Sequence, residues 1–138
     1  MTAREPVPFL IQPGEGRFIP GPRTRGGVTI KVSSELSGGS LTVYECTSAR
    51  GDEWGPGPHA HPSFDQVFYV LQGDYEFVVA DRRLRAHQGS AVFIPRGVFH
   101  DLQCAGGTPG RLLTFCSPGG IEDFFAELAH PRSQWSGS

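Results

Sequence analysis

Short runs of β-branched and aromatic residues, separated by glycine-containing turns, dominate the chain from Gly27 to Cys116. Runs of this length and spacing are typical of the strands of a sandwich or barrel. The predicted strands are residues 28–32, 41–46, 67–71, 75–80, 82–86, 90–95, 100–104 and 112–116. We therefore expect an all-β fold built from many short strands.

Two of these runs are separated only by Gln72, Gly73 and Asp74. Glycine adopts the positive φ of a tight turn without steric cost, so Gly73 suits the centre of such a turn. The pattern predicts that residues 67–71 and 75–80 pair as a β-hairpin.

The pattern changes to a helical period near the end of the chain. Ile121, Phe124, Phe125 and Leu128 recur at i, i+3, i+4 and i+7, and two acidic residues occupy the first turn, where they favour the helix dipole. We expect one short α-helix whose apolar face closes an open end of the barrel.

The chain divides into three parts by composition. Residues 1–26 contain five prolines among short apolar pieces, which indicates an extended N-terminal arm. Residues 27–130 form the predicted domain, and residues 131–138 are a polar tail expected to be flexible. An arm of this kind and open sheet edges predict a homodimer, in which the arm adds a strand or packs across the two-fold interface.

Charge and cysteine content exclude several classes of partner. The net charge of the 138 residues is −2, and no long run of like charges occurs, so nucleic acid and membrane are not expected as partners. The three cysteines are widely spaced and fit reduced thiols rather than a disulfide framework. No apolar stretch reaches the roughly 18 residues of a membrane span, and residues 1–14 contain no basic segment followed by an apolar stretch, as a signal sequence would. A cytoplasmic protein is expected.

Three histidines carry the candidate chemistry. His59 and His61 are two residues apart, so in an extended segment both imidazoles point to the same side. His100 stands at the head of a later predicted strand. Three imidazoles that converge at about 2.0–2.1 Å make a strong site for a divalent transition metal ion.

The sequence resembles the cupin family at these residues. The resemblance rests on two motifs, which this chain matches at His59, His61, Gly73, Gly89, Pro95, Gly97 and His100. It implies a cupin β-barrel of the jelly-roll type, with one metal ion per chain inside a ligand-sized cavity. Residues 65–73 and 119–125 are similar to the quercetin-dioxygenase-like branch of that family.

Two positions depart from the family pattern. Gln66 occupies the place of the motif's glutamate, so a neutral amide replaces the usual carboxylate ligand. The resemblance implies His59, His61, Gln66 and His100 as metal ligands, and Asp65 points away from the site by strand alternation. Cys104 occupies the place of the motif's asparagine, on the same face as His100. We take Gln66 and Cys104 as candidate catalytic residues, although the thiol could equally be a small buried hydrophobe.

Several aromatic residues are candidates for lining the cavity. Phe68 and Val70 share the strand face of Gln66, and Phe77, Phe93 and Phe115 lie on other predicted strands. Aromatic walls would suit an aromatic or polyketide-like small-molecule substrate, whereas in a closed barrel the same rings simply fill the interior.

Three functions follow from this reading. The first is a metal-dependent dioxygenase, with iron as the expected ion and nickel, manganese, cobalt, copper or zinc as alternatives. The second is a non-redox cyclase or isomerase of secondary metabolism, which Gln66 favours because Lewis acidity needs no base on the metal. The third is a non-catalytic cupin that binds a small ligand.

Overall fold

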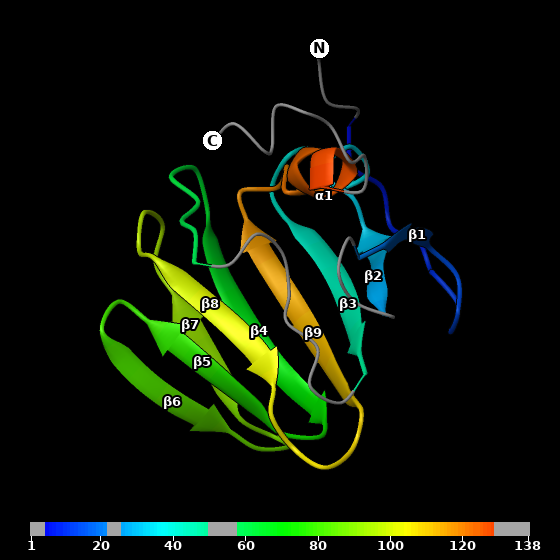
Figure 1. Cartoon of the computed structure of the whole chain (residues 1–138). Helices are drawn as coiled ribbons and strands as arrows, with labels where there is room; N and C mark the ends of the chain where they lie inside the picture. The colour runs from blue at the N-terminus through cyan, green and yellow to red at the C-terminus, as the bar shows by residue number, and fades with distance from the viewer. Residues whose placement is uncertain (1–4, 22–25, 50–57, 129–138) are drawn as a thin grey trace.

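The computed structural model describes residues 5–21, 26–49 and 58–128. They form strands in two antiparallel sheets and one short helix (Figure 1). The elements are β1 (Arg17–Pro20), β2 (Gly27–Val32), β3 (Thr42–Ser48), β4 (Asp65–Gln72), β5 (Tyr75–Val79), β6 (Arg82–Ala86), β7 (Ala91–Ile94), β8 (His100–Cys104), β9 (Gly110–Ser117) and α1 (Glu122–Leu128). The predicted all-β fold with one C-terminal helix is confirmed.

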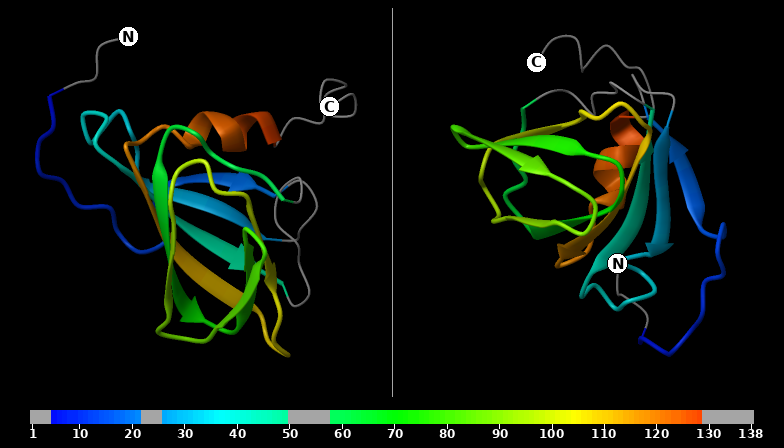
Figure 2. Two further views of the ribbon diagram at one scale, coloured as in Figure 1. Left: turned by 90° about the vertical axis from the view of Figure 1, so that its left-hand side faces the viewer. Right: turned by 90° about the horizontal axis from the view of Figure 1, so that it is seen from below.

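The two sheets face each other and enclose the core. The larger sheet has the strand order β1-β2-β3-β9-β4-β7, and the smaller has the order β6-β5-β8. Along β9 and β3, buried and more exposed residues alternate, as expected for strands with one face on the core. In Figure 2, α1 lies across one end of the space between the sheets.

The helix closes that end with the apolar face that its sequence predicts. Ile121, which directly precedes α1, and Phe125 are buried, and Phe124 packs against the same core. Glu122 in the first turn accepts hydrogen bonds from Thr42 Oγ1 at 2.7 Å and from the backbone N–H of Ser34 at 2.6 Å. These contacts fix the start of the helix to the larger sheet. The side chain of Leu128 lies outside the described residues.

The predicted hairpin at Gly73 is wrong, although the turn itself is present. Gly73 has a φ of +84°, and a Cβ there would lie 2.8 Å from the carbonyl oxygen of Pro109. However, β4 pairs with β7 and β9, whereas β5 pairs with β6 and β8. Both edges of β4 are already hydrogen-bonded within the larger sheet, so the turn carries the chain from one sheet to the other.

The N-terminal arm contains a strand that the sequence pattern did not predict. β1 pairs antiparallel with β2 of the same chain, with Phe18 opposite Thr29. Lys31 Nζ also donates hydrogen bonds to the carbonyl oxygens of Gln12 and Glu15, at 2.8 and 2.7 Å. The predicted tail, 131–138, lies outside the described residues. In the part of the chain that is described, no helix is long and apolar enough to cross a membrane.

Candidate metal centre

Two backbone segments bring the three histidines together. His59 and His100 form an antiparallel bridge, in which the N–H of His59 donates to the carbonyl of His100 at 3.0 Å and the reverse bond is 2.8 Å. Gly97 N–H donates to the carbonyl of His61 at 2.8 Å, and Gly97 has a φ of +80°. The turn before β8, which needs glycine at this position, therefore holds both ends of the His59–His61 segment against the start of β8.

The three imidazoles converge on one point. Their nearest potential ligand atoms all lie within 4.8 Å of one another. The ring centroid of His59 is 4.8 Å from that of His61 and 4.6 Å from that of His100. Nitrogen atoms bound to one ion at about 2.0–2.1 Å are roughly 3–4 Å apart, so a small closure of the rings suffices to share an ion.

Burial favours the neutral imidazoles that metal binding requires. The pKa of His61 is lowered from 6.5 to about 3, mainly by burial and in smaller part by His59 and His100. Burial also lowers the pKa of His100, partly offset by the hydrogen bond between His100 Nδ1 and the carbonyl of Val98 at 3.0 Å. Because Nδ1 donates to that carbonyl when the ring is neutral, Nε2 is left free to bind an ion.

Aromatic side chains cover the histidines. Phe124 of α1 stacks on His59 at 5.6 Å between ring centroids and meets the edge of His61 at 4.9 Å. Phe64 stacks on the ring of His61, with 4.8 Å between the ring centroids. His61 and His100 are buried, whereas His59 is only half-buried and marks the more open side of the site.

Gln66 lies beside the histidines with one end of its amide unpaired. Gln66 Nε2 donates to the hydroxyl oxygen of Tyr44 at 3.2 Å and to Cys116 Sγ at 3.5 Å. Gln66 Oε1 is buried and has no hydrogen-bond partner among the described residues. A buried carbonyl oxygen without a partner is costly, and a metal ion or its water would satisfy it. The residues present therefore fit a divalent ion held by three imidazoles and an amide oxygen.

Burial keeps the polar neighbours of Gln66 uncharged. It raises the pKa of Tyr44 well above 10, with further contributions from Cys116 and Cys46. It also raises the pKa of Cys116 to about 12 and that of Cys46 still higher. The three cysteines are reduced thiols rather than disulfide partners, as the sequence predicted.

The cavity between these residues is smaller than expected. Its volume is about 30 Å³, enough for only a few water molecules. Sites for organic ligands usually have about 300–1,000 Å³, so the expectation of a ligand-sized cavity is wrong for this conformation. The lining residues are Tyr44, Cys46, His59, His61, Gln66, Phe68, His100, Leu102, Ile121, Phe124 and Phe125.

Only some of the aromatic residues that we expected to line the cavity do so. Phe68 lines the cavity, and Phe77 is fully buried in the core beside it. Phe93 and Phe115 are 59% and 39% exposed, so they point away from the interior and their predicted place in the lining is wrong. Both stand on outward positions of the strand alternation in β7 and β9, which the sequence reading did not assign.

The structure does not bring Cys104 to the histidines. Cys104 ends β8 while His100 begins it, and Cys104 Sγ contacts the carbonyl of Thr108 at 3.6 Å. It is buried, but among the described residues it does not line the cavity. A role of Cys104 in the chemistry stays a prediction without support from this geometry.

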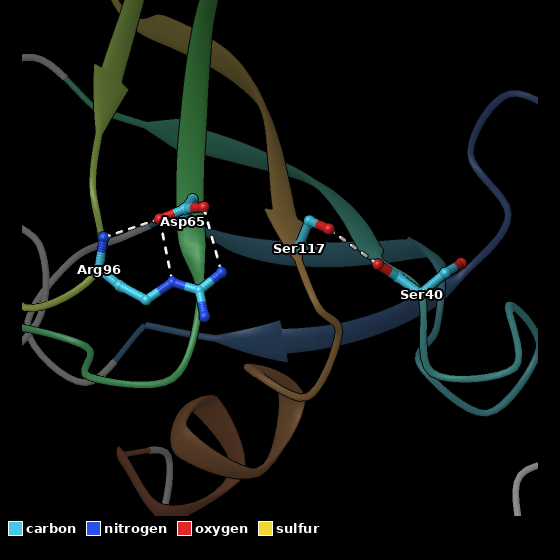
Figure 3. Close-up of polar contacts among 4 residues, drawn as sticks. All are labelled: Ser40, Asp65, Arg96 and Ser117. Carbon is cyan, nitrogen blue, oxygen red and sulfur yellow. Dashed lines mark hydrogen bonds and ion pairs between the residues drawn. The ribbon is translucent and has the colours of Figure 1, made fainter.

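Asp65 points away from the site, as strand alternation indicates. Its carboxylate accepts hydrogen bonds from the backbone N–H, Nε and NH2 of Arg96, at 2.9, 3.3 and 3.2 Å (Figure 3). Hydrogen bonds from Arg96 lower the pKa of Asp65. Nearby, Ser117 Oγ donates to the carbonyl of Ser40 at 3.0 Å in the same view.

Sequence reasoning missed Tyr44 and the direct contact of Phe124 with the histidines. Tyr44 lies on the inner face of β3 with Thr42 and Cys46, and alternation along residues 41–46 was the available signal. The helical stripe placed Phe124 on the inner face of α1, but no pattern in the sequence could show which residues it meets.

The comparison with protein families agrees with the fold and the site. The model of the cupin domain matches residues 47–116, which is half of the chain. The chain belongs to the cupin family. The matched segment contains all three histidines and Gln66. The match does not assign this cupin to the quercetin-dioxygenase-like branch, and no curated protein matches the sequence.

Three solved structures with similar folds have low sequence identity to this cupin. KdgF from Halomonas sp. is 21% identical with a TM-score of 0.69, over 85% of this chain and 99% of that chain. An RmlC-like cupin from Shewanella frigidimarina is 24% identical with a TM-score of 0.65, over 90% and 99%. The polyketide cyclase RemF from Streptomyces resistomycificus is 19% identical with a TM-score of 0.67, over 80% of each chain. At these identities the likeness shows the fold alone.

Proposed function

We propose that this cupin is a metal-dependent enzyme with one divalent transition metal ion per chain. The ligands are His59, His61 and His100, with Gln66 Oε1 as the fourth donor. The observation that carries the proposal is the convergence of three imidazoles, within 4.8 Å, beside a buried amide oxygen without a partner in the described part of the chain. When bound, such an ion supplies Lewis acidity, and iron adds redox chemistry with O₂.

The surrounding residues have defined tasks in this proposal. The Val98 carbonyl fixes the ring of His100, and Tyr44 and Cys116 fix the amide of Gln66. Phe64 and Phe124 keep bulk water from the imidazoles, which lowers the local dielectric and strengthens electrostatic contacts with a substrate. Only one small group of a substrate fits the present cavity, so the rest of the molecule lies outside it or displaces Phe124.

The reaction we propose first is dioxygenation of a small aromatic or polyketide-like substrate, with iron as the ion. Three histidines and one neutral amide leave coordination positions where substrate and O₂ can both approach. Phe68, Phe124 and Phe125 give the cavity aromatic walls that suit such a substrate.

A second candidate is a non-redox reaction such as cyclisation or isomerisation. It is favoured by the absence of a carboxylate among the described residues that line the cavity, because no side chain there can act as the usual carboxylate base. A ligand-binding cupin without catalysis is the third candidate.

Oxygen uptake by the iron-loaded protein separates these candidates. We expect substrate-dependent O₂ consumption with a panel of small phenols and polyketide-like diketones, and none with the His61→Ala variant. Conversion of a substrate without O₂ would instead support the second candidate. Binding without conversion, under either condition, would contradict both enzyme functions and leave the ligand-binding role.

A further inference from the structure

The ligand set of the proposed metal centre carries no negative charge. Imidazoles coordinate as neutral bases, and Gln66 offers an amide oxygen where a carboxylate would carry a charge. The other polar residues that line the cavity are Tyr44 and Cys46, whose side chains are ordinarily neutral at pH 7. No aspartate or glutamate stands among the described lining residues.

In the described part of the chain, the acidic side chains on the elements around the site are engaged elsewhere. Asp65 is paired with Arg96 on the outside of the larger sheet. Glu122 accepts hydrogen bonds from Thr42 and Ser34.

Asp101 follows His100 on β8, and its Oδ1 accepts a hydrogen bond from the N–H of Leu102 at 2.9 Å. Its position alternates with those of His100 and Leu102, which face the interior, so Asp101 is on the opposite face of β8. None of these three carboxylates lines the cavity.

A divalent charge in an apolar cavity needs a counter-charge. Leaving a charge uncompensated away from water is far more costly than pairing it. We infer that the metal centre selects a ligand that binds through an anionic oxygen, because Gln66 leaves the charge of the ion for the ligand to neutralise. This inference deepens the proposed function and rests on it. A carboxylate, enolate or phenolate fits the description, since each presents one or two charged oxygens on a small head group.

Acetate and acetamide test this inference, because they match in size and differ in charge. The protein is first loaded with Co²⁺, and one ion per chain is confirmed by elemental analysis. Each probe is then titrated at low ionic strength, with the visible Co²⁺ spectrum as the readout. We expect wild type to bind acetate at least about 10-fold more tightly than acetamide, and Gln66→Glu to weaken acetate binding about 10-fold while leaving acetamide unchanged.

Equal affinity of the wild type for the two probes overturns the inference, and so does an acetate affinity that Gln66→Glu leaves unchanged. If Gln66→Glu fails to fold or to load Co²⁺, the comparison of the two probes on wild type still decides. If wild type itself takes up no Co²⁺, the proposed metal site fails and the inference fails with it. The loading step therefore distinguishes the two failures.

The outer face of the larger sheet carries a row of apolar residues. The register places Val67 directly between Phe93 and Phe115, and Phe115 opposite Val43. The neighbouring row contains Tyr69 opposite Leu113 and Ala91. This outer apolar face therefore runs across β7, β4, β9 and β3, and it consists of Val43, Val67, Tyr69, Ala91, Phe93, Leu113 and Phe115.

Polar groups border the outer apolar face at both ends. The Asp65–Arg96 pair lies at one end, and the ion pair between Arg111 and Glu45, at 3.0 Å, lies at the other. An apolar centre with a polar rim is the usual composition of a protein interface.

The arm adds a second exposed apolar element. Val7, Phe9 and Leu10 are 65%, 44% and 74% exposed, beyond the anchoring of Gln12 and Glu15 to Lys31. We multiply the exposed fraction of each side chain by its full area, which is about 200 Å² for an aromatic residue. The sum over Val7, Phe9, Leu10, Phe18 and the rings of the outer apolar face is roughly 700 Å² per chain. Two copies would then bury about 1,400 Å², within the range of about 1,200–2,000 Å² for a standard interface.

We propose that a second copy of this chain covers the outer apolar face, with its arm as part of the contact. A two-fold dimer brings the same patch of both copies together, so one apolar face and one arm per chain complete the interface. The metal centre lies on the inner side of the same sheet, so the dimer leaves the half-buried His59 open to ligands.

Sedimentation velocity at 1–50 μM protein tests this proposal. We expect the wild type to be a dimer, and Phe93→Glu to weaken the dimer at least about 100-fold, because it places a charge in the apolar centre of the contact. Phe99→Glu is the matched control: Phe99 is 64% exposed but lies beside the end of β5, outside this face, so its dimer is unchanged. A monomeric wild type, or equal behaviour of the two variants, overturns the proposal.

Discussion

The two ends of the space between the sheets use buried polar groups in different ways. Beneath α1, the imidazoles of His61 and His100 converge with the amide of Gln66. The oxygen of that amide has no partner within the described chain. A small cavity remains at this end. The polar groups here fit a divalent metal ion.

The opposite end is closed by contacts within the protein. Tyr75 is fully buried, and its hydroxyl donates to Ser48 Oγ at 3.0 Å. Cys104 lies opposite Tyr75 in the β5–β8 pair and contacts Thr108. Burial of polar groups alone therefore does not mark a site. The mark is convergence combined with an unmet hydrogen-bonding need.

The largest expected effect follows from removing one ligand. His61→Ala lowers the affinity for a divalent ion by more than about 100-fold, because loss of a ligand exceeds the 10–100-fold effect of losing a neighbour that only orients one. The barrel core does not include this side chain, so the variant remains folded. Isothermal titration with Zn²⁺ measures the affinity, and circular dichroism reports the fold.

Tyr75→Phe is the matched variant at the closed end. It removes the hydrogen bond to Ser48 and lowers the free energy of unfolding by about 1 kcal/mol, with no change in affinity for Zn²⁺. A loss of metal affinity in this variant as large as that in His61→Ala would contradict the division between the two ends.

The second prediction concerns pH. The folded protein holds the pKa of His61 near 3, whereas an unfolded chain has a histidine pKa of about 6.5. Below about pH 6.5, His61 is therefore protonated in the unfolded chain but stays neutral in the folded chain. The free energy of unfolding of the metal-free protein falls as the pH falls toward 3. Between pH 7.5 and pH 5, His61 contributes a loss of about 2 kcal/mol.

Urea unfolding with a chelator present measures this pH effect. His61→Ala should reduce the dependence between pH 7.5 and pH 5, and Tyr75→Phe should keep it. An unchanged pH dependence in His61→Ala would show that the imidazole is not held in its neutral form by the fold.

The third prediction concerns the aromatic cover. Phe124→Ala removes the ring that contacts both His59 and His61, so water and chelators reach the ion more easily. We expect the metal to dissociate about 10-fold faster in EDTA, with the free energy of unfolding lowered by about 1–3 kcal/mol. A dissociation rate equal to that of wild type would mean that Phe124 does not control access to the site.

Substitution of Cys104, like that of Tyr75, is expected to have little effect on metal binding. Cys104→Ala leaves the affinity for Zn²⁺ within about twofold of wild type and lowers the free energy of unfolding by about 1 kcal/mol, as for a small buried side chain. A large loss of Zn²⁺ affinity would show that the Cys104 thiol does contribute to the metal site.

The sequence predicted much of the fold and the centre of the site, because alternation and motif spacing are local properties. His59, His61, His100 and Gln66 were identified from a two-residue repeat and from motif positions. The strands from β2 to β9 were predicted from apolar runs between turns, as was the helix from its stripe. Each of these signals lies within a short segment of the chain, so it can be recognised without knowing the tertiary contacts.

The remaining features depend on contacts between distant segments. The strands beside Gly73 join different sheets, which no local turn signal can show. Phe93 and Phe115 are apolar but face outward. Composition alone does not distinguish the inner face of a strand from an exposed apolar outer face. The small cavity volume depends on the packing of α1 against His59 and His61, which the helical stripe does not specify.

The most direct test of the central claim is the metal content of the purified wild-type protein, measured by elemental analysis after anaerobic purification that keeps Fe(II) reduced. We expect close to one divalent transition metal ion per chain, reduced to a trace in His61→Ala. A wild-type protein that stays metal-free after incubation with Fe²⁺, Co²⁺ and Zn²⁺ would contradict it.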